Sequence, residues 1–126
     1  MNGFTYDTGA LVAAEARRDD VWALHKRVLN RGLSPIVPAV VLAQAWRGGP
    51  QPLLSQFLRG CVVEAFIETR ARGVGVALAR SETNDIVDAA VVISALGRGG
   101  TVVTSDPDDL RRVAERLGAK LQLHVV

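Results

Sequence analysis

Short β-prone runs alternate with helix-like runs along almost the whole chain, and this alternation constrains the fold more than any other feature. Strands are expected at residues 4–6, 33–37, 61–67, 101–104 and 120–126. Helices are expected at residues 8–18, 19–29, 39–47, 52–58, 68–80, 86–96 and 107–117. Such alternation favours an α/β fold with a mostly parallel sheet, whose apolar strands are covered on both faces.

Several helix ends are marked by particular residues. Asp19 and Asp20 are expected to cap the helix that follows them, and Asp106 is expected to cap the helix that starts at Pro107. The helix that starts at residue 86 is expected to end near Gly97. These signals predict where three of the helices begin or end.

The size and composition are those of an ordinary folded domain. The 126 residues suit a single domain over residues 1–126, and hydrophobic residues make up 48% of them. No apolar run approaches the roughly 20 residues that a membrane-spanning helix needs, and the start of the chain lacks the pattern of a secretory signal. The single cysteine, Cys61, fits a reducing compartment. We therefore expect a cytoplasmic protein, and its net charge of +2 permits contact with nucleic acid.

Three aspartates are expected to meet at one edge of the predicted sheet. Asp7 follows the first strand, and Asp106 follows the strand at 101–104. Asp88 lies near the start of the apolar helix at 86–96. Ligands of open α/β sheets bind beyond the carboxyl ends of the strands, close to the point where the strand order reverses. The sequence therefore places a candidate site there.

Converging carboxylates repel one another unless they take up protons or bind a cation. The only histidines, His25 and His124, are distant in sequence from the three aspartates. A ligand set of oxygen atoms alone indicates Mg²⁺ or Mn²⁺ rather than zinc. Such an ion can activate water and stabilise charge on a leaving phosphate oxygen.

A purely structural reading of the same acids is also open. Asp7 and Asp106 each precede a predicted helix, and Asp85 and Asp88 lie at the start of another. Carboxylates at these positions commonly cap helices and interact with the helix dipole. Each acid taken alone is compatible with capping, whereas the set of them together favours a site.

Four segments carry a resemblance to a known family. They are Tyr6–Leu11 (YDTGAL), Val37–Gly48 (VPAVVLAQAWRG), Asp88–Leu96 (DAAVVISAL) and Thr104–Leu110 (TSDPDDL). In this order and spacing they resemble the motifs of the PIN domain, in particular of VapC-type toxins of bacterial toxin–antitoxin pairs. The interval from Asp88 to Asp106 favours Asp88 over Asp85 as the third acid.

The resemblance implies more than periodicity does. It implies a three-layer α/β/α fold, a homodimer, and cleavage of single-stranded RNA that depends on Mg²⁺ or Mn²⁺. It also implies neutralisation by a partner antitoxin. Asp7, Asp88 and Asp106 would then be the catalytic and metal-binding acids.

One position departs from the family pattern. The second motif normally carries a glutamate, and this chain has Gln44 there. Glutamine offers a carbonyl oxygen and an amide donor in place of a charge. We expect Gln44 to belong to the catalytic set, Asp85 to compensate as a further metal ligand, and Asp109 to be a second candidate helper. The alternative is that Asp85 and Asp109 are merely exposed caps.

Two other functions remain open. The chain could be a PIN-like binding module that keeps its partner surfaces and has lost catalysis through Gln44. It could instead be a phosphoryl-accepting domain with Asp7 as the acceptor. Against the latter, Gly9 stands where haloacid-dehalogenase-like enzymes carry a second acid. Receiver domains carry a lysine after a late strand, whereas Lys120 here stands at the start of the last one.

Overall fold

Five parallel strands form one sheet in the computed structural model, which describes residues 3–126. The strand order is β3-β2-β1-β4-β5, and every pairing between neighbours is parallel. The strands are β1 (Phe4–Tyr6), β2 (Ile36–Pro38), β3 (Val62–Glu64), β4 (Thr101–Thr104) and β5 (Gln122–Val125). The helices are α1 (Thr8–Glu15), α2 (Asp19–Asn30), α3 (Ala39–Ala45), α4 (Pro52–Leu58), α5 (Glu68–Ser81), α6 (Ile86–Arg98) and α7 (Pro107–Arg116).

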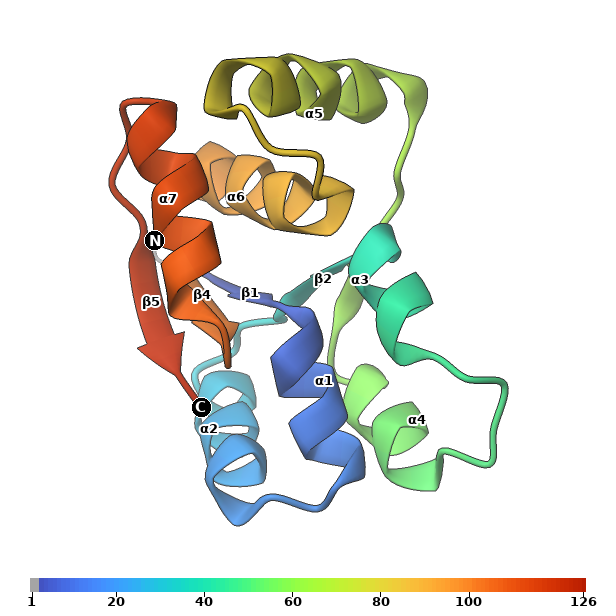
Figure 1. Cartoon of the computed structure of the whole chain (residues 1–126). Helices are drawn as coiled ribbons and strands as arrows, with labels where there is room; N and C mark the ends of the chain where they lie inside the picture. Colours follow the sequence, from blue (N-terminus) through green and yellow to red (C-terminus); the bar gives the residue numbers. More distant parts are fainter. Residues whose placement is uncertain (1–2) are drawn as a thin grey trace.

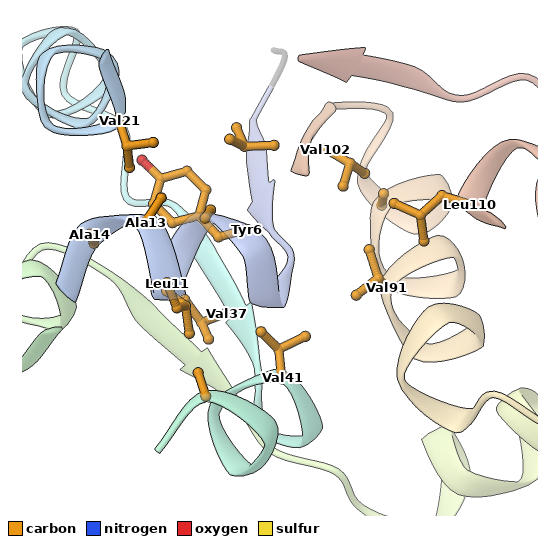
Figure 2. Close-up of a cluster of buried hydrophobic side chains, with 14 of the residues drawn as sticks. Tyr6, Leu11, Ala13, Ala14, Val21, Val37, Val41, Val91, Val102 and Leu110 are labelled. Carbon is orange, nitrogen blue, oxygen red and sulfur yellow. The ribbon is translucent and has the colours of Figure 1, made fainter. Parts of the chain in front are cut away.

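Helices cover both faces of the sheet. Figure 1 shows α1, α2 and α4 on one side of the strands and α5, α6 and α7 on the other. Figure 2 shows the resulting core, with Leu11 and Val41 on one side and Val91 and Leu110 on the other. The expected α/β class with three layers and a parallel sheet is therefore confirmed.

The sequence of β4 shows why both faces must be covered. Successive strand residues point to opposite faces of a sheet, yet Val102 and Val103 are both completely buried. Thr104, the next residue, is completely buried as well. Such a strand is stable only between two helical layers.

The strand order reverses between β1 and β4. From β1 the chain builds outward to β2 and β3, and it then returns to add β4 and β5 on the other side of β1. The backbone N–H of Asp7 donates to the carbonyl of Val103 at 2.9 Å, so the pairing of these two strands continues to the end of β1. The carboxyl ends of β1 and β4 therefore lie side by side at the switch in strand order, where ligands of such sheets bind.

Two expected helix boundaries were wrong. Asp19 and Asp20 lie in the first turn of α2, and Arg18 occupies the cap position without a side-chain capping bond. Helix α6 continues through Gly97 to Arg98 and ends at Gly99, whose φ of 69° is the left-handed conformation that glycine adopts readily. A glycine does end α6, as expected, but it is Gly99 and not Gly97.

Several elements are shorter than their sequence pattern. The first helix ends at Glu15 instead of residue 18, and the third strand covers Val62–Glu64 instead of residues 61–67. Phe66 and Ile67 have β-prone side chains but are 39% and 56% exposed, beyond the last strand pairing of β3. No helix within residues 3–126 is long and apolar enough to cross a membrane.

Candidate metal and active site

Asp7 is the most deeply buried acid of the candidate site. It follows β1 directly and is only 6% exposed. Its Oδ1 accepts a hydrogen bond from the backbone N–H of Thr8 at 2.8 Å, which makes it the N-cap of α1. Its Oδ2 accepts a hydrogen bond from the Thr104 hydroxyl at 2.7 Å. The capping interpretation is thus correct for Asp7, but it leaves the carboxylate free to accept further interactions, because two oxygens offer about four acceptor positions.

Thr104 joins Asp7 to Asp106. It was not among the site residues predicted from the sequence. Its Oγ1 donates to Asp7 and accepts from the backbone N–H of Asp106 at 2.9 Å. The hydroxyl therefore fixes the start of the loop after β4 relative to the end of β1. Its place in the TSD segment, at the carboxyl end of a strand, was the one available signal.

The next two acids lie at the start of α6. Asp85 is the N-cap of this helix, and its Oδ1 accepts from the backbone N–H of Asp88 at 2.9 Å. The other oxygen of Asp85 has no protein partner among residues 3–126. Asp88 occupies the first helical turn and is partly buried. Both acids serve the helix end, and both line the same pocket as Asp7.

Asp106 and Asp109 complete the acidic set from the other side. Asp106 occupies the N-cap position of α7 but makes no side-chain capping bond, so the expected capping role is wrong in that respect. Asp109 lies in the first turn of α7 and forms an ion pair with Arg112 at 3.2 Å. Both line the pocket.

Gln44 reaches the pocket from α3. Its Oε1 accepts a hydrogen bond from the Thr8 hydroxyl at 2.6 Å. With its carbonyl oxygen in that contact, the amide group is left as a potential donor. The side chain therefore lies where the resemblance expected the second motif to contribute, next to the residue that follows Asp7.

These residues surround one pocket of about 500 Å³ at the carboxyl edge of the sheet. The sequence-predicted residues that line it are Asp7, Gln44, Asp85, Asp88, Asp106 and Asp109. The remaining lining residues are Thr8, Gly9, Val12, Ala13, Ala16, Arg18 and Ser105. The structure thus brings the predicted residues together from three separate helices and one strand end. Lys120 lines a different pocket, beside Arg111 and Leu121.

The charges in this pocket are not neutralised by the protein. Among residues 3–126, Asp7, Asp85, Asp88 and Asp106 form no ion pair with a basic side chain. Arg18 lines the pocket but forms its ion pair with Asp20. The mutual repulsion of the acids therefore remains, and a bound cation would relieve it.

Burial and mutual repulsion raise the pKa values of three of these acids. Burial, followed by the charges of Asp85, Asp7, Asp109 and Asp106, raises the pKa of Asp88 to about 7. Burial also raises the pKa of Asp7, while hydrogen bonds from Thr104 and Thr8 partly offset that rise.

The pKa of Asp106 is raised as well, by desolvation first and then by the nearby carboxyl group of Asp109. Three acids with raised pKa values in one pocket form the electrostatic pattern of a functional site.

The donor set fits a hard divalent cation in its chemistry, since carboxylate and amide oxygens are the ligands that Mg²⁺ and Mn²⁺ prefer. In residues 3–126, however, no three acidic, histidine or cysteine side chains are drawn together closely enough to hold an ion by themselves. Mg²⁺ usually keeps several waters and needs only one or two carboxylates. The pocket thus suits an ion that is held partly through water.

Comparison with solved structures identifies the fold. A chain in the crystal structure of VapBC2 from Rickettsia felis, bound to a DNA fragment from its promoter, matches with a TM-score of 0.70 and 17% identity over 98% of both chains. A chain of FitAB bound to an IR36 DNA fragment matches with a TM-score of 0.65 and 13% identity over 97% of this chain and 94% of that one. The chain has the PIN-domain fold.

A third PIN-type neighbour, PAE2754 from Pyrobaculum aerophilum, matches with a TM-score of 0.61 and 18% identity, covering 94% of this chain and 90% of that one. No protein-family model and no curated protein matches the sequence. The resemblance drawn from the four motifs is therefore confirmed at the level of the fold.

Proposed function

We propose that this PIN-type protein is a metal-dependent endoribonuclease that cleaves single-stranded RNA and acts as the toxin of a toxin–antitoxin pair. The observation that supports this best is the acidic pocket itself. It lies at the switch in strand order, it gathers acids from several elements, and its four central carboxylates have no basic partner in the described chain. A stable fold tolerates such a cluster when a cation binds there.

The proposed metal ligands are Asp7, Asp85, Asp88 and Asp106. When bound, Mg²⁺ or Mn²⁺ supplies a Lewis acid that polarises a phosphate oxygen and favours ionisation of water. Asp7 is held by two hydrogen bonds, so it presents its carboxylate in a fixed orientation. Gln44 contributes its amide group, which can donate a hydrogen bond to a phosphate oxygen of the substrate.

A partner antitoxin and a homodimer belong to the same proposal. The structures of two neighbours, VapBC2 and FitAB, contain bound DNA, and the name VapBC2 denotes a toxin–antitoxin pair of the kind expected from the sequence. By analogy we propose that a cognate antitoxin binds this chain and blocks the acidic pocket. Copurification of the toxin with the product of a neighbouring reading frame, followed by loss of activity in the complex, tests this point.

The activity is tested directly with purified protein. We expect the protein to cleave a labelled single-stranded RNA in the presence of Mn²⁺ and to be inactive in EDTA. Asp7→Asn is expected to abolish cleavage while preserving the fold, because asparagine retains the capping role at this position. Equal inertness of wild type and Asp7→Asn, at any Mn²⁺ concentration, would contradict the proposal.

A second candidate function is supported by Gln44. A neutral side chain stands where the family has an acid, and it lies in the pocket next to Thr8. A protein that binds its partner but does not turn over RNA is the corresponding alternative. Partner binding that persists in a protein inert toward RNA would favour this binding module over the nuclease.

A further inference from the structure

Gly9 makes an unusually close approach to the loop that carries Asp106. It lies in the first turn of α1, two residues after Asp7. A Cβ atom at Gly9 would lie 2.0 Å from Oγ, 2.7 Å from Cβ and 3.0 Å from the backbone N of Ser105. The Ser105 hydroxyl could rotate away from such an atom, but the Cβ and backbone of Ser105 could not. Any side chain at Gly9 therefore displaces this loop or the start of α1.

The backbone conformation does not explain this glycine. Gly9 is helical and is absent from the residues with positive φ, so any residue could adopt its backbone angles. Glycine inside a helix is destabilising relative to alanine. The benefit must therefore come from the space that the missing side chain leaves for Ser105.

The same contact lies at the junction of the acidic site. Ser105 stands between Thr104, whose hydroxyl donates to Asp7, and Asp106, whose backbone N–H donates to that same hydroxyl. Moving Ser105 outward would stretch this link and carry the Asp106 carboxylate away from Asp7. The closeness of α1 to the β4–α7 loop thus sets the separation of two proposed metal ligands.

We propose that Gly9 is a positioning residue of the acidic site: its missing side chain allows the β4–α7 loop to close against α1, and this closure places Asp106 opposite Asp7. The inference rests on the proposed metal-dependent function for its consequence, but its structural part is independent of metal. Gly9 acts through Ser105 and Asp106 and need not touch the ion or the substrate itself.

The chain offers matched controls. Gly73 and Gly75 in α5 and Gly97 in α6 are also helical, and apart from their chain neighbours and the backbone of their own helix no atom lies within 4 Å of a Cβ built on them. Gly97→Ala should therefore leave the site unchanged, because alanine fits there and favours the helix. Gly9→Ala introduces the same methyl group at a helical glycine that lies against the β4–α7 loop.

The test combines Gly9→Ala with substitutions at Ser105. We expect Gly9→Ala to weaken Mn²⁺ binding, measured by calorimetry, by roughly 10- to 100-fold, as for loss of groups that orient metal ligands. Gly9→Ala/Ser105→Gly should recover most of the affinity, since of the three nearest contacts only the one with the backbone N of residue 105, at 3.0 Å, remains. Gly9→Ala/Ser105→Ala should recover less, since the 2.7 Å contact of the two Cβ atoms persists.

A second readout needs no metal. In metal-free protein, hydrogen exchange of the Asp106 amide should be faster in Gly9→Ala than in wild type and should slow again in the Ser105→Gly double variant. Unchanged exchange and unchanged Mn²⁺ affinity in Gly9→Ala would overturn the inference, as would a loss that Ser105→Gly does not reverse. If wild type binds no Mn²⁺ and cuts no RNA, the proposed function fails, and the exchange rates still decide the role of Gly9.

Discussion

The charge of Asp88 should cost the metal-free protein stability. The pKa of this carboxyl rises from 3.8 to about 7 through burial and the charges of four neighbouring acids. The folded state therefore holds the proton at a higher pH than the unfolded chain, so ionisation of Asp88 opposes folding. Its destabilising effect is absent below about pH 3.8 and grows as the pH rises toward 7. Replacement by asparagine removes this cost.

The size of the effect follows from the structure. A pKa difference of this size corresponds to about 4 kcal/mol for a fully shielded group. Asp88 is only partly buried, so solvent screening reduces the value to about 1–2 kcal/mol. Asp88→Asn also loses a favourable charge in the first turn of α6, worth about 0.3–1 kcal/mol. We expect the metal-free variant to be more stable than wild type by about 1 kcal/mol at pH 8.

Urea denaturation followed by tryptophan fluorescence, at several pH values, measures this difference. Wild type should gain stability relative to Asp88→Asn as the pH falls from 8 to 5. Added Mn²⁺ should reverse the order, because a ligand at about 100 times its dissociation constant stabilises the folded state by about 2.7 kcal/mol, and the variant binds it weakly.

Asp19→Asn is the matched control, since Asp19 is an exposed acid in the first turn of α2 outside the pocket. This variant should be neutral or slightly destabilised and should respond to Mn²⁺ as wild type does. An Asp88→Asn variant less stable than wild type without metal, at every pH, would refute the electrostatic reasoning.

Three further changes probe the same site and the core beside it. Gln44→Glu should tighten Mn²⁺ binding by about tenfold, because added ligand charge raises affinity; unchanged or weaker binding would place Gln44 outside the metal site. Thr104→Val should lower the free energy of unfolding by about 1–3 kcal/mol, because a buried oxygen of Asp7 loses its donor. Thr104→Ser keeps the hydroxyl and should retain most of the stability. Equal stabilities of the two variants in urea would contradict a stabilising hydrogen bond between Thr104 and Asp7. His25, whose Nδ1 lies 2.9 Å from the Tyr6 hydroxyl, has its pKa lowered below 6.5 by burial. Its own contribution to stability should therefore fall as the pH drops below about 6.5, opposing the gain from Asp88. His25→Gln should remove this contribution, and a variant whose stability changes with pH in the same way as that of wild type would argue against it.

Sequence reasoning predicted the fold well where burial alone decides the structure. The strand at 101–104 was predicted with its observed ends, because its apolar side chains are covered on both faces. The strand at 61–67 was predicted too long, because Phe66 and Ile67 are β-prone but lie beyond the pairing with β2. The β-propensity of the side chains indicates which residues can form a strand, whereas pairing with the neighbouring strand decides how many of them do.

The candidate site shows a similar division. Asp7 and Asp106 could be singled out from sequence because each follows a strand, and parallel strands end at one edge. Thr104 was harder to single out, because its hydroxyl acts on a carboxylate 97 positions earlier in the chain, and its position just before Ser105-Asp106 does not reveal that contact. The contact of Gly9 with Ser105 was hidden for the same reason. Packing between distant segments has no local signature.

The sequence left open whether these acids cap helices or belong to a site, and the structure shows that the two roles are compatible. Asp7 and Asp85 are both N-caps, and both line the acidic pocket. One hydrogen bond from a helix N–H fixes the rotamer of the side chain and still leaves acceptor positions on the carboxylate. A capping hydrogen bond therefore does not prevent the same carboxylate from binding a cation. It follows that Asp→Ala changes at these positions would confound lost capping with lost charge, whereas Asp→Asn keeps the cap. Asp85→Asn therefore reports on the charge of the site, while Asp7→Asn also removes the oxygen that accepts from the Thr104 hydroxyl and is read together with Thr104→Val.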